Sequence, residues 1–355
     1  MSKKHNFSAG PCILPQEVFQ KSAEAILDFN GSGLSLLEIS HRSKDFVAVM
    51  DEARAIVKRL MKLGDDYEVI YLGGGASLQF AMVPFNLMKL EGGKAAYINT
   101  GTWAAGAIKE AKKLGSVDVV GSSKEENYSF IPKDYQVGNE YDYFHCTSNN
   151  TIYGTQMREF PKVDTLLVCD MSSDIFSRVI DFSQFDIIYA GAQKNMGPAG
   201  TTLVVVKKEI LGKTGRDIPS MLDYSLHIAK ESMYNTPPVF PVYASLLTLQ
   251  HLENNGGIAA AELRNEAKAK LIYGEIDRNP LFETFCTVKE DRSLMNVSFK
   301  LLDESKKEEF DNAWKAAGIS GLNGHRSLGG YRASMYNALP MESVQVLVDV
   351  MQNLK

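Results

Sequence analysis

Short apolar runs alternate with polar and amphipathic stretches between about residues 66 and 206. Runs rich in Val, Ile, Leu and Tyr that end at Gly or polar residues are typical of buried strands. Strands that alternate with helical patterns indicate strand–helix–strand units on a mainly parallel sheet. We therefore predict an α/β fold with seven strands in its large domain, at residues 67–72, 95–99, 117–120, 141–146, 165–170, 185–190 and 201–206.

Two helices are predicted between these strands. One covers residues 78–88, and the other covers residues 102–114, with Thr102 as its N-cap and Gly115 as its end signal. After residue 255 the pattern changes to a helix, two strand-like runs around Phe285 and Val297, a helix at 304–317, the segment 332–336 and a final helix from Met341. We expect a large domain at 16–255 and a small α+β domain at 256–355, with residues 1–15 packed near the small domain.

The composition is that of an ordinary soluble globular protein. Of the 355 residues, 45% are hydrophobic and 23% are charged, and the net charge is −5. A negative balance argues against nucleic acid or an anionic membrane as a partner. With no signal-peptide pattern and no apolar run long enough for a membrane span, we expect a cytoplasmic protein. The four cysteines contain no CxxC pair, so we expect neither a disulfide framework nor a metal site.

The clearest chemical signal is Lys194, which lies in the small-residue stretch 189–200 between two predicted strands. The pattern predicts a strand-to-strand loop rather than a solvated helix face. Desolvation there would give the lysine the lowered pKa that makes an amine a good Schiff-base nucleophile. A single loop lysine is more often merely exposed, so the other residues must decide between these interpretations.

Gly73-Gly74-Gly75 follows a predicted strand and precedes a helix. Bare backbone N–H groups at a helix start can hold a phosphate, especially with Ser77 following, although three glycines also form tight turns. The spacing matches neither a dinucleotide-binding motif nor a P-loop. A non-catalytic phosphate- or nucleotide-binding protein is therefore an alternative from a different functional class.

Asp170 ends a predicted strand at the carboxyl edge of the sheet, where open α/β folds bind ligands. Such an aspartate is often only a turn residue, but it also suits the anion that keeps a pyridoxal ring nitrogen protonated. Trp103 could stack on that ring or serve only in packing. Arginine forks and histidines suit carboxylates and phosphates, and we single out His41, Arg42, His325, Arg326 and Arg332.

Taken in order along the chain, these motifs resemble the phosphoserine aminotransferases, a class V aminotransferase family with the aspartate-aminotransferase fold (fold type I). The resemblance runs from residue 5 to the C-terminal helix. It rests on residues 6–11, 38–42, 73–75, 189–200, 235–238 and 324–326, which read NFSAGP, EISHR, GGG, YAGAQKNMGPAG, NTPP and GHR.

The resemblance implies a pyridoxal 5′-phosphate enzyme that works as a homodimer with active sites at the subunit interface. Lys194 would carry the cofactor and shuttle the proton, Asp170 would pair with the ring nitrogen, Trp103 would stack on the ring and Thr151 would bond the cofactor. The phosphate would be held by Ala76, Ser77 and Gln193, together with Asn235 and Thr236 of the other subunit.

The implied reaction moves an amino group between glutamate and 3-phosphohydroxypyruvate, giving phosphoserine and 2-oxoglutarate in serine biosynthesis. Arg332 would bind the α-carboxylate. Arg42 and His41, with His325 and Arg326 from the partner subunit, would bind the distal phosphate or carboxylate. Both substrates would then use one anion site.

Ser77 departs from relatives that carry an arginine there, which bears on substrate affinity and on 4-phosphohydroxythreonine, of pyridoxine biosynthesis, as a second substrate. Rival enzymes of the same fold, such as alanine–glyoxylate aminotransferases or cysteine desulfurases, share the lysine and aspartate. They have no reason to carry the GHR motif beside a second anion-binding arginine.

Overall fold

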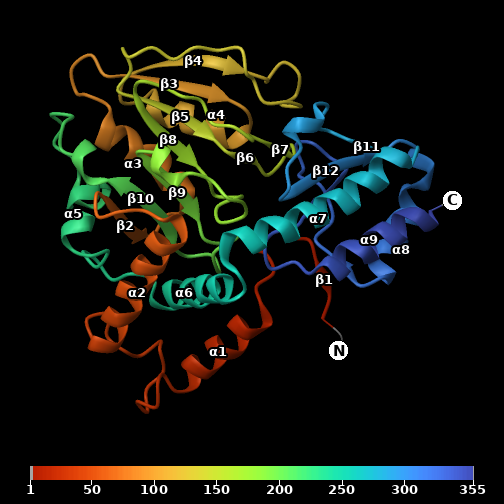
Figure 1. The fold of residues 1–355 in the computed structure, drawn as a ribbon, viewed down its shortest axis with the longest axis horizontal. Coiled ribbons are helices and arrows are strands. Elements are labelled where there is room, and N and C mark those ends of the chain that lie inside the picture. The colour runs from red at the N-terminus through yellow and green to blue at the C-terminus, as the bar shows by residue number, and fades with distance from the viewer. Residues whose placement is uncertain (1–2, 355) are drawn as a thin grey trace.

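The computed structural model describes residues 3–354 and consists of a large body and a small body joined side by side (Figure 1). The large body is built on a seven-stranded sheet with the order β2-β10-β9-β8-β5-β3-β4. Its strands are β2 (Tyr67–Leu72), β3 (Lys94–Asn99), β4 (Ser116–Ser122), β5 (Tyr143–Thr147), β8 (Leu166–Asp170), β9 (Ile187–Gly191) and β10 (Thr202–Lys207).

Strand β10 is antiparallel to both of its neighbours, and the other adjacent strands are parallel. The predicted α/β fold with a mainly parallel sheet of seven strands is confirmed, with strand ends shifted by at most three residues. Because β2 runs in the same direction as β9, the carboxyl ends of β2, β3, β5, β8 and β9 meet at one edge of the sheet.

Helices cover both faces of this sheet. Alternate strand residues pack against α3 (Gly75–Leu87) and α4 (Thr102–Ala111) on one face. The other alternate set packs against α2 (Lys44–Met61) and α6 (Val239–Asn254). The two predicted helices are confirmed, but Thr102 is not an N-cap: Gly101 takes that position, and Thr102 is the first helical residue.

Four helices went unpredicted, namely α1 (Gln16–Leu27), α2, α5 (Tyr224–Ala229) and α6. The start of α2 carries a recognisable signal, because the Ser43 side chain accepts a hydrogen bond from the N–H of Phe46. Apolar residues at helical spacing follow it. Helix α6 is apolar on most sides, so it lacks the periodic stripe that reveals a surface helix.

The small body packs three helices on a three-stranded sheet. Its elements are α7 (Gly257–Arg278), β11 (Phe282–Thr284), β12 (Asn296–Leu301), α8 (Lys307–Ala316), β14 (Tyr331–Ser334) and α9 (Met341–Asn353). Strand β1 (His5–Asn6) pairs with β13 (Ile319–Ser320) beside them. Helix α7 contributes Ile258 and Ala261 to the large core and its later residues to the small core, so the proposed boundary at 255/256 precedes a shared helix.

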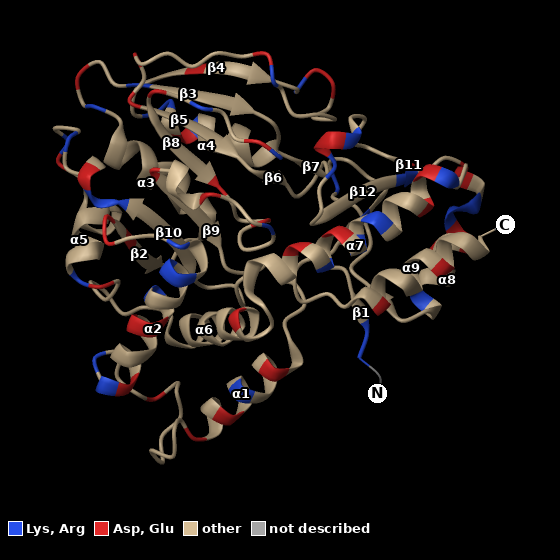
Figure 2. Cartoon of the chain, viewed as in Figure 1, with Lys and Arg blue, Asp and Glu red and all other residues tan. Residues whose placement is uncertain are grey.

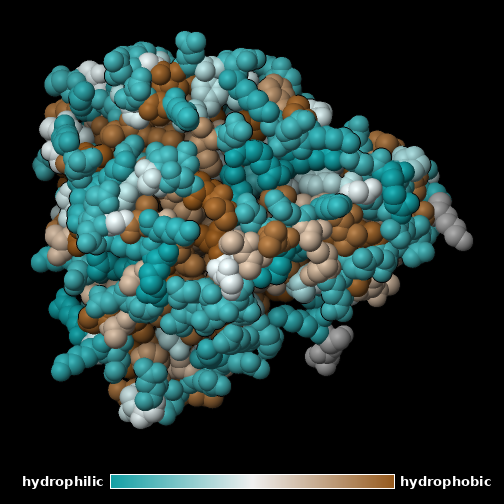
Figure 3. Space-filling model, viewed as in Figure 1, coloured by the Kyte–Doolittle hydropathy of each residue, from teal (hydrophilic) through white to brown (hydrophobic). Residues whose placement is uncertain are grey.

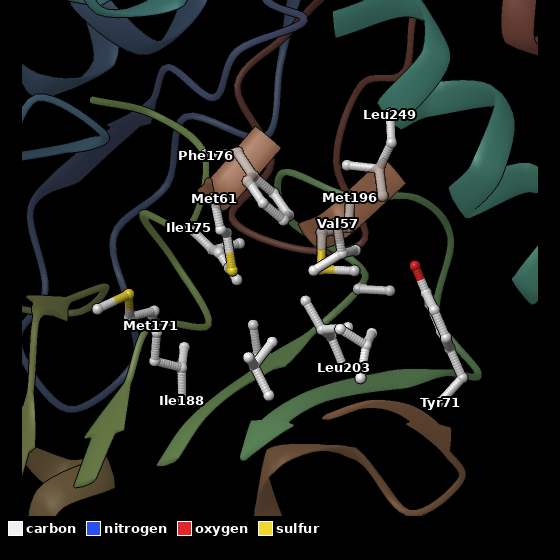
Figure 4. Packing of buried hydrophobic residues seen from close by; sticks show 14 of the residues in the cluster. Val57, Met61, Tyr71, Met171, Ile175, Phe176, Ile188, Met196, Leu203 and Leu249 are labelled. Atoms are coloured by element: carbon white, nitrogen blue, oxygen red, sulfur yellow. The ribbon is translucent and has the colours of Figure 1, made fainter. Parts of the chain in front are cut away.

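The loop after β9 is fastened to the large core by Met196. This residue is fully buried, and Figure 4 shows it among Val57, Leu203 and Leu249, side chains that come from α2, β10 and α6. The amides of Met196 and Gly197 also donate to the carbonyl of residue 192. The backbone two residues from Lys194 is therefore held by packing on three elements.

Charged residues of both signs are mixed along the outer helices, whereas the large sheet carries few (Figure 2). Among residues 3–354, no helix is long and apolar enough to cross a membrane. Lys268 of α7 is an exception to the exposed placement of charge. It is 1% exposed, and its ammonium donates to the carbonyls of Met335, Tyr336 and Leu339 at 2.9, 2.8 and 3.2 Å.

Lys268→Met should lower the free energy of unfolding by about 2–4 kcal/mol, because it removes one hydrogen bond from each of three buried carbonyls while keeping the side-chain volume. The Tyr336 carbonyl still accepts from the Leu339 N–H. Denaturant unfolding measures the change. Lys270→Met, at an exposed position of the same helix, is the matched control and should stay within about 0.5 kcal/mol. Equal stabilities of the two variants would show that the hydrogen bonds of the Lys268 ammonium do not stabilise the fold.

Candidate functional site

A cavity of about 330 Å³ lies at the sheet edge where the strands' carboxyl ends meet. Asp170 is the last residue of β8, and Lys194 follows β9. Alternation along β8 places Asp170 on the same sheet face as α3 and α4. Nine of the sequence-predicted site residues line this cavity: Ala76, Ser77, Trp103, Thr151, Asp170, Gln193, Lys194, His325 and Arg332.

The Lys194 amine is held inside the cavity by Thr151, whose Oγ1 accepts a hydrogen bond from Nζ at 2.7 Å. The N-terminal segment closes over the lysine's backbone. Cys12 Sγ donates to the Lys194 carbonyl at 2.7 Å, and Gly10, whose φ of +138° favours glycine, packs against Gln193 and Lys194. Both ends of the side chain are thus fixed.

Burial lowers the pKa of Lys194 from its usual value to about 8. The negative charge of Asp170 works against that shift, and the positive charge of Arg332 adds to it. An amine with this pKa is neutral, and so nucleophilic, in a substantial fraction of molecules near neutral pH. The loop predicted from sequence is confirmed in position, and the structure supplies the desolvation that we expected.

Asp170 is 4% exposed, and burial raises the pKa of its carboxyl. Hydrogen bonds from Ser172, including its backbone N–H to Oδ1 at 2.9 Å, and the charge of Lys194 oppose the rise. A protonated ring nitrogen placed against this carboxyl would stabilise its anionic form further. The site therefore contains a buried carboxylate that a cationic aromatic ring would complement.

The opposite end of the cavity suits a phosphate. Helix α3 begins at Gly75, with Gly74 as N-cap and no acidic residue in its first turn, so its free N–H groups and positive dipole end are available to an anion. Trp103, at the start of α4, is 41% exposed and also lines the cavity. An amine, a carboxylate, an indole and a helix N-terminus together fit pyridoxal phosphate.

Arg332 and His325 form the side that faces the small body. Arg332 Nη1 donates to the Thr151 carbonyl at 3.3 Å, and burial lowers the pKa of the guanidinium. His325 Nδ1 is 2.7 Å from Ser327 Oγ, and burial together with Arg332 and Arg326 lowers its pKa. The Arg332 guanidinium, with the His325 imidazole as a further hydrogen-bonding group, makes this side attractive to an anion.

Five predicted site residues lie outside this cavity. Asn235 and Thr236 are exposed and line a separate pocket beside Gly73 and Gly74, on the other side of the α3 start. The remaining three are His41, Arg42 and Arg326, of which the two arginines are exposed. His325 was expected from the partner subunit; in the single chain it lines the chain's own cavity.

Sequence reasoning missed several residues that line the cavity. They are small or amide side chains without a motif of their own: Ala9, Gly10, Thr147, Asn149, Ser172 and Ser173. The sequence did carry a signal for Ser172. A serine two residues after a strand-end aspartate can donate a hydrogen bond to the carboxylate. Among residues 3–354, no group of three or more His, Cys, Asp or Glu could hold a metal ion.

Comparison with known proteins bears on the whole chain. The family described as aminotransferase class-V matches residues 4–347. Phosphoserine aminotransferase of Flavobacterium psychrophilum is 71% identical over 354 residues, covering 99% of each chain. Phosphoserine aminotransferase of Parabacteroides distasonis is 57% identical over 355 residues, again covering 99% of each.

Solved structures give the same picture. The chain superposes on phosphoserine aminotransferase from Bacillus circulans subsp. alkalophilus with a TM-score of 0.95 and 42% identity, covering 99% of this chain and 98% of that one. On the pyridoxal-phosphate-bound phosphoserine aminotransferase of Trichomonas vaginalis, the chain superposes with a TM-score of 0.93 and 34% identity. The match covers 99% of this chain and 100% of that one. The alanine–glyoxylate aminotransferase of Nostoc, at 16% identity and a TM-score of 0.74, shares the fold alone.

The pKa of Lys194 predicts how fast the cofactor-free protein reacts with pyridoxal phosphate. Below about pH 8 the neutral amine is the minor form, so the rate should rise roughly tenfold per pH unit, and it should level off above pH 8. Stopped-flow absorbance of the covalent product measures this rate. A rate that keeps rising to pH 10 would show an ordinary, solvated lysine.

Proposed function

Because the chain belongs to the class V aminotransferase family, we propose that it exchanges an amino group between L-glutamate and 3-phosphohydroxypyruvate, reversibly giving O-phospho-L-serine and 2-oxoglutarate. This is a step of L-serine biosynthesis. The observation that carries the proposal is the single cavity that brings the Lys194 amine, the Asp170 carboxyl and the Arg332 guanidinium together.

Pyridoxal 5′-phosphate is the cofactor, and when bound it supplies an aldehyde carbon that receives the amino group and a ring that withdraws electrons. Asp170 would hold the ring nitrogen and Trp103 would stack on the ring. Thr151 would hydrogen-bond the cofactor. Ala76, Ser77 and Gln193 hold the phosphate at the start of α3, where the helix dipole favours an anion.

Lys194 serves two purposes in this proposal. Its Nζ would hold the cofactor covalently and, once free, would carry the proton between the substrate α-carbon and the cofactor. Both uses require a neutral amine, which burial favours by lowering the pKa to about 8. Thr151 Oγ1 holds the amine in place between these steps, because it lies 2.7 Å from Nζ.

Arg332 binds the α-carboxylate that all amino-acid substrates share, as a forked donor inside the cavity. His325 stands beside it and contributes to the distal anion site, with Arg326 next to it in the chain. Phosphate and the glutamate side-chain carboxylate are both anions, so one site accepts both. A glycine or alanine side chain offers nothing to this site, which limits the substrate class.

A homodimer supplies what the single chain leaves out. His41, Arg42, Asn235 and Thr236 lie away from their own cavity, and among residues 3–354 the buried His41 Nε2 has no hydrogen-bond partner. Figure 3 shows hydrophobic side chains among hydrophilic ones at the lower edge, where α1 and α2 lie. Exposed apolar side chains there are Phe19, Ile26, Leu27, Leu34 and Leu37.

This arrangement supports a division in which His41 and Arg42 of one subunit complete the distal anion site of the other, while His325 serves its own chain. The Asn235 and Thr236 side chains likewise reach the partner's phosphate. We place the enzyme in the cytoplasm, and its four free cysteines are in keeping with a reducing compartment.

A coupled assay with phosphoserine and 2-oxoglutarate tests the reaction. Glutamate should form, and alanine in place of phosphoserine should be a poor donor because it lacks a distal anion. Lys194→Ala should abolish the transfer and also the link that borohydride reduces, even where some cofactor still binds. A pyridoxyl group on any other lysine, or equal turnover with alanine, would refute this assignment.

Subunit mixing tests the division between chains. Mixing Lys194→Ala with Arg42→Ala subunits should restore roughly half of the activity per heterodimer, because one of its two sites then has both residues intact. Mixing Lys194→Ala with His325→Ala subunits should restore nothing, because both residues of a site come from one chain. The reverse pattern, with subunit exchange demonstrated by mass, would overturn the division.

A further inference from the structure

A hairpin of the large body lies against the small-body sheet next to the cavity. It is formed by β6 (Asn149–Asn150) and β7 (Thr155–Gln156), and its turn carries Thr151, the residue that holds the Lys194 amine. The carbonyl of Gly154 in this turn accepts a hydrogen bond from the N–H of Ser293 at 3.0 Å. A Cβ at Gly154 would lie 2.9 Å from a main-chain oxygen of β12. The two bodies therefore touch here at the level of the backbone.

Asn296 of β12 is the polar link across this joint. Its Oδ1 accepts a hydrogen bond from Asn149 Nδ2 at 2.8 Å, and its Nδ2 donates to Ser334 Oγ at 3.0 Å and to the Tyr336 hydroxyl at 3.2 Å. Asn296 is 0% exposed and Asn149 is 3% exposed. Buried amide pairs with all partners in place fix relative positions, because each broken bond leaves a desolvated polar group.

Through its hydrogen bonds, Asn296 connects to the segments that carry Thr151, which holds the Lys194 amine, and Arg332. Asn149 is two residues before Thr151, and Ser334 is two residues after Arg332 on β14, which pairs with β12. The direct contact between the two sides is weaker, since Arg332 Nη1 is 3.3 Å from the Thr151 carbonyl and Arg332 is partly exposed. We infer that Asn296 is a positioning residue, which sets the distance between the Arg332 guanidinium and the Lys194 amine.

The chemistry of the pocket around residue 296 requires an amide. The Tyr336 hydroxyl already donates to the Ala9 carbonyl at 2.6 Å, so it can only accept from residue 296. Asn149 on the other side donates. A carboxylate at 296 would present an oxygen to the Tyr336 oxygen. An apolar side chain would take an acceptor from Asn149 and a donor from Ser334 and Tyr336, although Asn149 would still donate to Ser173 Oγ.

This inference rests on the proposed function, because it assigns Asn296 an effect on substrate binding through Arg332. In Asn296→Leu and in the isosteric Asn296→Asp at pH 8, KM for phosphoserine and for glutamate should rise together by roughly 10-fold or more, since the arginine meets a carboxylate common to both. The dissociation constant of pyridoxal phosphate, measured by absorbance titration, should change less than about twofold. Asn296→Asp keeps the measurement possible if the leucine variant folds poorly.

Asn86→Leu is the matched control. Asn86 is also buried, donates to the carbonyls of Met82 and Leu222 and accepts from the Tyr224 N–H, but it lies in the last turn of α3 and its hydrogen-bond partners belong to neither the hairpin nor the small body. It should lower the melting temperature and leave KM unchanged. A rise in KM in this control as large as in the Asn296 variants would show that loss of stability alone explains the effect.

A double-mutant cycle with Arg332→Ala separates the inference from the proposed function. If Asn296 acts through Arg332, its substitution should add almost nothing to KM once the guanidinium is gone. Effects that multiply in the double variant, or Asn296 variants with unchanged KM, would overturn the positioning role while leaving Arg332 in place. An unchanged KM in Arg332→Ala itself would remove the proposed carboxylate site, and the inference with it.

Discussion

Taking the Lys194 amine out of water costs free energy, because the charged form loses its hydration and finds only Thr151 and the nearby charge of Asp170 in exchange. That cost is what lowers the pKa toward neutrality. Packing elsewhere in the fold offsets this desolvation free energy, and it holds the lysine from both sides. Met196 is locked into the large core behind it, and the segment around Gly10 and Cys12 covers its backbone in front.

The sheet makes this arrangement possible through the direction of its strands. All strands of the large sheet except β10 end at one edge, so their following residues converge although they are far apart in sequence. The start of α3 and the start of α4 lie on the same face as Asp170. A positive helix end, an indole and a carboxylate thus face one cavity, and each complements a different part of a pyridoxal phosphate molecule.

The small body contributes the Arg332 guanidinium to the cavity. Arg332 sits on a strand of that body, yet it contacts Thr151 of the large body, and the buried amides of Asn149 and Asn296 join the two bodies beside it. Reaction chemistry and substrate binding therefore depend on a joint between two separately packed cores. Helix α7, which contributes to both cores, makes that joint stiffer than a flexible linker would be.

The sequence by itself determined the strands, the loop of Lys194, the strand-end carboxylate of Asp170 and the glycine-rich start of α3, because each depends on a periodicity or a composition that is local in the chain. Its motif order also carried the family resemblance. Tertiary structure alone decided which residues share the cavity. It brought His325 to the lining of the cavity, left His41 and Arg42 outside that lining, and revealed the contact between Asn149 and Asn296, which are 147 residues apart. Such contacts depend on strand order and on packing between bodies, and no local pattern of hydrophobic and polar residues specifies them.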